Sequence, residues 1–218
     1  MKILSQQIKF LPMRQIIKII ILFLILPVYA QKTDFSQNIM RSVGYIQVDN
    51  GVKNVFIYID TAYSENRIRV HNMQMTQNFA KMKNDTIIIS KPNNQTSQKQ
   101  PLVSVYLNHI PKGIDIFADG ECIFTVLNKI NTNEFSINAK ENAKISFCVV
   151  DEWIFNSLSV NQESNSDIYF SKLSVNKNLF LKTADATFQA NEENIKDGIK
   201  STILSHNSSI KIKGFTTE

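Results

Sequence analysis

Glycine and proline are scarce in this chain, with six and five copies among 218 residues. Tight two-residue hairpins need glycine or asparagine wherever the backbone becomes left-handed. We therefore expect asparagine, aspartate, serine and lysine to make the corners, because asparagine and aspartate tolerate left-handed backbone better than other non-glycine residues. The shortage of glycine disfavours a sandwich of hairpin-linked strands.

Helical periodicity is also missing after residue 30, where the apolar pattern has a period of two. The three histidines, His71, His109 and His206, are scattered and have no partner at a ligand-like spacing. No acidic residue recurs at a fixed position to build a strip of carboxylates. A glycosidase or a polysaccharide lyase would need carboxylates that converge on one side of the fold. We predict surface or turn positions for the histidines, and no catalytic, cofactor-binding or metal-binding residue.

Cysteine is limited to Cys122 and Cys148. Export to an oxidising compartment would permit a disulfide. When the repeat described below is aligned, Cys122 lies over Ile145 and Cys148 follows three positions later, so direct stacking of the two thiols is not implied. Two small buried apolar side chains are the alternative, and the sequence leaves both open.

The first thirty residues have the order of a secretory signal peptide. A basic region precedes an apolar run at 19–26, and small residues at 28–30 follow Pro27. The run is far shorter than the roughly 20 residues that span a bilayer. We predict cleavage after Ala30 and export to the periplasm, cell surface or medium of a bacterial cell, with no membrane span afterwards. A retained membrane anchor is the alternative.

The basic charge of the chain belongs mostly to this leader. Residues 1–30 hold four of the 24 Lys and Arg residues and none of the 19 Asp and Glu residues. Without them, 20 basic residues face 19 acidic ones. A nucleic-acid partner would require a clustered basic surface, so we expect none.

A unit of 21 to 24 residues organises the second half of the chain. An apolar–x–apolar triplet is followed by a small polar corner and a second apolar–x–apolar piece. Stacked copies would bury apolar faces that one copy cannot bury alone. The triplets begin at Ile114, Phe135, Leu158, Leu179 and Ile203, and the second pieces are 122–124, 145–147, 168–170, 187–189 and 210–212.

This repeat predicts an all-β fold, a right-handed parallel β-helix (solenoid) of about five turns preceded by a small β-sheet region. Expected divisions are a signal peptide at 1–30, an N-terminal strand region capping the solenoid at 31–101, and the β-helix repeat region at 102–218. Residues 31–42 are expected to be a loose lead-in, and 92–101 an exposed loop. Strands at 43–48 and 52–60 flank a turn with the Asn-Gly pair typical of hairpins.

The run LVSVYLNHIPKGIDIFADGECIF, with the earlier KMKNDTIIISK, VGYIQV and VFIYID, resembles the auto-transporter adhesin, head GIN domain family of secreted bacterial proteins. The likeness covers about residues 43–214. The family's corners are usually Ser-Gly-x-Gly, whereas here they read ADGE, AKEN, QESN, TADA and HNSS. The resemblance implies a β-helix-like exported protein with no established activity and no catalytic residues.

Asp151-Glu152-Trp153 is the most conspicuous candidate site, because an exposed tryptophan beside two acids can stack on a sugar ring. A tryptophan that covers the core edge is the other reading. Asp115 and Asp119 share one repeat, and we do not expect them to act as a pair.

The sequence favours a non-enzymatic binding or adhesion scaffold for a protein or glycan. A polysaccharide-active enzyme using Asp115 or Asp151 is the alternative, and a structural or regulatory envelope module is a third possibility. The last repeat leaves strand edges to be covered, which suggests a homodimer through the C-terminal end of the solenoid.

Overall fold

The computed structural model describes residues 33–39, 41–49, 51–73, 79–91, 102–195, 199–205, 207–212 and 215–217. None of these residues lies in a helix, and thus none belongs to a helix able to cross a membrane. The predicted signal peptide and the predicted loop at 92–101 lie outside the described residues.

The described residues form one sheet of 17 strands, so the predicted all-β class is confirmed. Period-two alternation accounts for it, since buried and exposed positions alternate along the strands. The strands are β1 (Thr33–Ile39), β2 (Tyr45–Asp49), β3 (Val55–Ile59), β4 (Asn66–Met73), β5 (Ala80–Lys83), β6 (Thr86–Ser90), β7 (Leu102–Leu107), β8 (Gly113–Ile116), β9 (Glu121–Val126), β10 (Ile130–Ala139), β11 (Lys144–Val149), β12 (Trp153–Glu163), β13 (Asp167–Ala184), β14 (Thr187–Ile195), β15 (Ile199–Ser205), β16 (Ser209–Ile212) and β17 (Phe215–Thr217).

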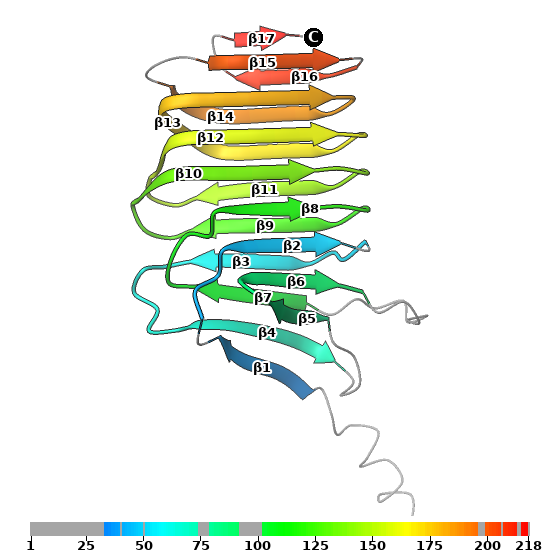
Figure 1. Cartoon of the computed structure of the whole chain (residues 1–218), viewed down its shortest axis with the longest axis vertical. Coiled ribbons are helices and arrows are strands. Elements are labelled where there is room, and N and C mark those ends of the chain that lie inside the picture. Colours follow the sequence, from blue (N-terminus) through cyan, green and yellow to red (C-terminus); the bar gives the residue numbers. More distant parts are fainter. Residues whose placement is uncertain are drawn as a thin grey trace, which may run out of the picture.

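Most strand pairs are parallel, and the sheet is not closed. Antiparallel pairs lie towards the two ends: β1–β4, β4–β7 and β5–β6 at one, and β16–β17 at the other (Figure 1). Parallel pairing requires the chain to cross back between strands rather than to turn tightly, which agrees with the shortage of glycine hairpins.

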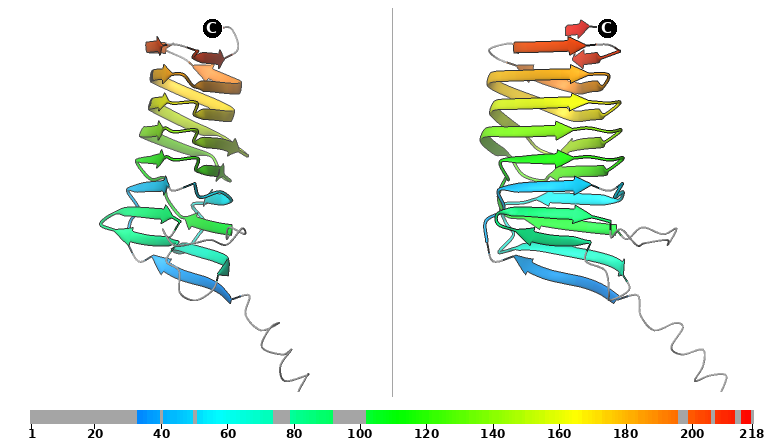
Figure 2. Two further views of the ribbon diagram at one scale, coloured as in Figure 1. Left: turned by 90° about the vertical axis from the view of Figure 1, so that its right-hand side faces the viewer. Right: turned by 45° about the vertical axis from the view of Figure 1, so that its right-hand side comes forward.

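The parallel strands form two stacks along the long axis of the molecule, as the rotated views show (Figure 2). The first stack runs β6–β2–β8–β10–β12–β13–β15. The second runs β7–β3–β9–β11–β13–β14–β16. Strand β13 is long enough to contribute to both stacks, and so it joins them into one sheet.

The N-terminal strands differ from two expectations. β2 and β3 do not pair with each other: β2 lies between β6 and β8, and β3 lies between β7 and β9. β2 and β3 are therefore not the two arms of a hairpin; Asn50 of the Asn-Gly pair lies outside the described residues. The predicted loose lead-in is also wrong in part, because β1 pairs with β4 and covers an edge that would otherwise be open. The division at residues 101 and 102 stays a prediction.

The predicted register of the triplets is partly right. Phe135, Leu158 and Leu179 are strand partners, as expected. Ile114 pairs with Ile137 instead of Phe135, a shift of two that leaves its side chain on the inward face. At the last repeat, a bulge after Leu179 places Ile203 opposite Lys182.

The second pieces behave similarly. Cys122, Ile145 and Ile168 are aligned, as expected. The next piece is displaced by one residue, so that Phe188 rather than Thr187 pairs with Ile168. This displacement puts the aromatic side chain inside, since neighbouring residues of a strand point to opposite faces.

A column of aromatic side chains fills the interior. Phe124, Phe147 and Phe170 occupy one position on successive strands of the second stack, with ring centroids 5.4 and 4.2 Å apart. Burying each phenylalanine contributes roughly 1.5–3 kcal/mol, and ring pairing adds to this. Packing of buried side chains is therefore the chief source of stability in the repeat.

Several corners between the stacks place residues other than glycine in left-handed backbone. Asp119, Asn142 and Asn165 have φ angles of 59°, 61° and 60°. The Asn142 amide donates to Asp119 Oδ1 at 2.9 Å, and the Asn165 amide donates to Asn142 Oδ1 at 3.4 Å. The expectation that asparagine and aspartate make corners is confirmed, and these residues also form a recurring side-chain ladder that the sequence analysis missed.

Candidate binding surface

The Asp151-Glu152-Trp153 cluster is not an exposed sugar-stacking site. Trp153 is 1% exposed, because it begins β12 with its side chain inward. Its ring packs 4.4 Å from that of Phe155, and its Nε1 donates to Thr132 Oγ1 at 2.7 Å. Glu152 pairs with Lys129 at 2.6 Å, while Asp151 is exposed. The reading of Trp153 as core is the right one.

The acidic residues considered for catalysis do not converge. Asp115 lies on β8 and accepts a hydrogen bond from Asn138 Nδ2 at 2.6 Å. Asp119 belongs to the corner ladder, and Asp151 lies in the loop between β11 and β12. Within the described ranges, no group of three or more His, Cys, Asp or Glu side chains is arranged to hold a metal ion.

His109 has a structural role in a half-buried turn. Its Nε2 accepts the Val43 backbone N–H at 3.0 Å, and its Nδ1 lies 2.8 Å from Asn108 Oδ1. It thus ties the segment before β2 to the loop after β7. His71 is half-buried on β4, and His206 lies outside the described residues.

The two cysteines are free thiols on opposite sides of their strands. Cys122 points into the core, where burial raises its pKa well above the usual range. Cys148 lies at an outward position, one residue after the inward Phe147, and is half-buried. A bond between them would require one side chain to pass through the strand.

A group of half-buried aromatic side chains faces outward on the surface of the second stack, together with one exposed isoleucine. We call it the aromatic strip: Phe56 and Tyr58 of β3, Tyr106 of β7, Tyr63 after β3, and Ile123 of β9. Alternation explains its position, since the residues that flank Phe56 and Tyr58 in β3 are at most 1% exposed.

The rings of the strip are held by one another. Tyr58 and Tyr106 are strand partners, and their rings stack with centroids 5.2 Å apart and an interplanar angle of 16°. Tyr63 meets Tyr106 edge-on at 5.8 Å, and Phe56 lies 6.5 Å from Tyr58 with nearly parallel rings. These contacts fix the side chains before any partner arrives, which lowers the entropy cost of binding.

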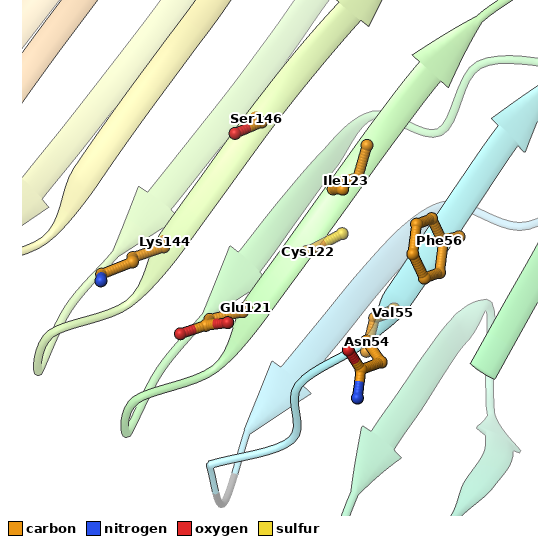
Figure 3. A pocket seen from close by; sticks show the side chains of 8 residues that line it. All are labelled: Asn54, Val55, Phe56, Glu121, Cys122, Ile123, Lys144 and Ser146. Carbon is orange, nitrogen blue, oxygen red and sulfur yellow. The ribbon is translucent and has the colours of Figure 1, made fainter. Parts of the chain in front are cut away.

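A shallow hollow of about 300 Å³ continues the strip across β3, β9 and β11. Figure 3 shows Phe56, Ile123 and Ser146 lying side by side on these strands, with Glu121 and Lys144 towards the corners. Ile123 is 37% exposed and contributes an apolar side chain to the lining of the hollow. The hollow therefore has an apolar floor and a charged rim.

Charges surround the strip but do not enter it. The Arg67 guanidinium lies 5.9 Å from the centre of the Tyr106 ring, a cation–π contact. At the rim, Lys53 and Glu121 form an ion pair of 3.1 Å. Burial raises the pKa of Tyr58 and of Tyr63, with the nearby Tyr106 phenol adding to both effects.

Sequence reasoning identified the strands of this surface but not the surface itself. The signal was present: VFIYI and LVSVYL carry aromatic residues at the positions that alternate with the apolar core residues. Pairing Tyr58 with Tyr106 requires knowing that β3 and β7 are neighbours. Forty-eight residues separate the two tyrosines, and no short-range pattern specifies that pairing.

No family model and no curated protein matches the chain. Solved structures do match. A protein from Parabacteroides distasonis described as a "putative adhesin" aligns with a TM-score of 0.59 at 14% identity, over 83% of this chain and 76% of that one. This match shows a shared fold, in agreement at that level with the resemblance noted in the sequence.

Two further matches are weaker and carry no argument. A "putative adhesin" from Bacteroides fragilis has a TM-score of 0.43 at 10% identity, covering 80% of this chain and 97% of that one. A "putative lipid binding protein" from Parabacteroides distasonis has a TM-score of 0.36 at 10% identity, covering 82% and 96%.

Proposed function

We propose that this protein is an exported, non-enzymatic adhesion scaffold that binds a protein partner through the aromatic strip. The observation that carries the proposal is the stacked, outward-facing group of Phe56, Tyr58, Tyr63 and Tyr106 on a rigid sheet. Aromatic residues and arginine are enriched in the central, energetically dominant part of protein interfaces. The name adhesin given to the protein of similar fold agrees with this role.

The charges on each side of the strip indicate what the partner should look like. Arg67 and Arg69 lie on β4, which neighbours β7, and Lys144 lies on β11 at the rim of the hollow. A partner segment with an apolar or aromatic anchor flanked by carboxylates would complement this arrangement. The rim charges would mainly speed association and select the orientation.

We also infer that the two stacks wind as a right-handed parallel β-helix of about five turns. Support comes from Ile137, Val160 and Leu181, which are consecutive strand partners at the spacing of the sequence repeat. Parallel strands in register at such a spacing need one full circuit of the chain between them. Right-handed crossover is the strong preference for parallel connections.

Export is proposed from the order of basic, apolar and small residues in 1–30. Pairing of two molecules through the C-terminal end is proposed as well: among the strands described, β15 has a partner on one side only, whereas β16 is covered by β17. Amino-terminal sequencing of the secreted protein tests cleavage after Ala30. Light scattering tests the dimer, which a strictly monomeric protein would contradict.

The binding proposal is tested by comparing envelope proteins captured by the unaltered protein with those captured by Tyr106→Ala. Val150→Ala is the matched control, since Val150 is 61% exposed and lies outside the strip. We expect one captured protein to disappear with Tyr106→Ala and to remain with Val150→Ala. The affinity of this captured protein for Tyr106→Ala should be at least tenfold lower than for the unaltered protein, which corresponds to about 1.4 kcal/mol of binding free energy. Identical capture by all three proteins would refute the proposal.

A further inference from the structure

The outer surface of the first stack carries a second hollow that differs in chemistry from the aromatic strip. Its volume is about 890 Å³. We call it the serine hollow, and its main lining residues are Tyr45, Ser136, Ser157, Ser159, Asn178 and Phe180.

The floor of the serine hollow follows the strand register. Tyr45, Gly113, Ser136, Ser159 and Phe180 are successive strand partners across β2, β8, β10, β12 and β13. Their inward neighbours are buried, so these five positions face out in one row parallel to the stacking axis. An aromatic ring stands at each end of the row, and only small residues lie between.

Small residues between the two rings are needed to keep the floor of the hollow open. A Cβ on Gly113 would lie 2.2 Å from Ser136 Oγ and 2.6 Å from the Ser136 carbonyl oxygen. The serine side chain therefore occupies the space above the glycine. Any larger residue at position 113 would force the strands or the serine to move.

A second row of polar groups runs beside the first. Glu134, Ser157 and Asn178 are successive strand partners. Asn178 Nδ2 donates to Ser157 Oγ at 3.1 Å, which orients the amide and leaves its oxygen available as an acceptor. The hollow thus offers hydroxyl and amide groups, while Lys112 and Glu134 are the charged residues among its lining.

From these observations we propose that the serine hollow binds a neutral, extended oligosaccharide whose chain runs along the stacking axis. Sugar hydroxyls would exchange hydrogen bonds with Ser136, Ser159 and Asn178, and the ring faces of terminal sugars would lie against Tyr45 and Phe180. Phe180 is 42% exposed, so its ring is accessible for such a contact.

The length of the row sets the length of the ligand. Four strand spacings of about 4.8 Å separate Tyr45 from Phe180, or about 19 Å. One pyranose unit of an extended chain is close to one strand spacing in length. A chain whose terminal sugars lie against both rings therefore has about five units, because five units enclose four spacings, and shorter chains reach only one of the two rings.

Other occupants fit less well. A peptide strand would seek free backbone groups at a sheet edge, whereas this row lies in the interior of the sheet, where the backbone groups serve the ladder. An acyl chain would leave the serine hydroxyls of the floor without partners, which costs free energy. The near balance of Lys112 and Glu134 gives a strongly charged polymer no advantage.

The experiment is isothermal titration of the purified protein with neutral cello-, malto- and N-acetylchito-oligosaccharides of two to six units. For at least one series, we expect affinity to rise with length to about five units and then to level off. Phe180→Ala should weaken binding of the hexamer at least tenfold and remove part of the gain from length. The pair Ser136→Ala with Ser159→Ala should weaken binding of every length.

Folding is monitored by thermal unfolding, and Val150→Ala serves as the control that should bind normally. Three results would overturn the proposal: no binding in any series, affinity independent of length, or unchanged affinity in both sets of hollow variants. Binding of phosphatidylcholine vesicles that the hollow variants lose, with no oligosaccharide binding, would assign the hollow to lipid instead. The residues of the serine hollow are not part of the aromatic strip. A negative result in this titration would therefore leave the proposed capture of a protein partner untouched, and the reverse also holds.

Discussion

The aromatic strip and the serine hollow are built on the same scaffold, yet their surfaces differ. Both lie on outward positions of parallel strands, and both stand on inward rows of isoleucine, valine, leucine and phenylalanine. One outward surface collects Phe56, Tyr58 and Tyr106, while the other places Gly113, Ser136 and Ser159 in a row. Inward positions are constrained by stacking, because each must fit the side chains above and below it. Most outward positions are less constrained, with Gly113 beneath Ser136 as an exception, and so they can carry side chains suited to a ligand.

The largest loss of stability is expected from a substitution in the core, on which both surfaces stand. Trp153→Ala should lower the free energy of unfolding by about 3–5 kcal/mol, since it removes a buried aromatic side chain from the core column. Val150→Ala should change stability by less than about 0.5 kcal/mol. Chemical denaturation measures both, and equal midpoints for the two variants would show that Trp153 is not in the core.

Surface-specific variants should separate the two binding activities. Ile123→Ser and Tyr106→Ala should each weaken capture of the protein partner about tenfold or more, equivalent to about 1.4 kcal/mol. Phe180→Ala should leave that capture within twofold. Surface plasmon resonance with the captured partner makes the comparison, and a parallel loss in all three variants would merge the two surfaces into one.

The corner ladder connects the two stacks without belonging to either surface. Asn142→Ala removes the hydrogen bond to Asp119 and puts alanine at a φ of 61°. The expected loss is about 1–2 kcal/mol, the cost of left-handed backbone for a residue with a Cβ. Asn142→Gly should cost less, because glycine adopts this conformation readily. If glycine proves as harmful as alanine in thermal unfolding, the side-chain ladder matters more than the backbone.

The smallest effect concerns a polar side chain inside the scaffold. Gln162 is fully buried between Ala139 and Thr183, and neither its amide nitrogen nor its oxygen has a hydrogen-bond partner among the described residues. Gln162→Leu should leave stability unchanged or raise it by up to about 1 kcal/mol, because an unpaired buried polar group is costly. Both binding activities should persist. Denaturation that shows a clear loss of stability would mean that this amide is paired.

Local pattern was enough to predict the strands and much of the stacking. The alternation around Phe135, Leu158 and Leu179 identifies both the inward face and the partners. It failed at Ile203, where a bulge displaces the pairing, and at Thr187, where inward burial of Phe188 decides the register. Bulges and one-residue displacements depend on packing against the preceding strand, which a single repeat unit does not encode.

The candidate surfaces were harder to predict. Reasoning from sequence singled out Trp153 as a candidate beside two acids, with core cover as the other reading, and the structure turns its side chain inward at the start of β12. The outward row from Tyr45 to Phe180 draws on strands separated by more than a hundred residues. Such rows become visible only when strand neighbours are known.

Titration of the length-matched oligosaccharide into the unaltered protein, Phe180→Ala and Tyr106→Ala tests most directly whether one scaffold carries two separate binding surfaces. The account predicts at least tenfold weaker binding for Phe180→Ala and binding within twofold of the unaltered protein for Tyr106→Ala. Equal weakening in both variants, or weakening in Tyr106→Ala alone, would contradict it.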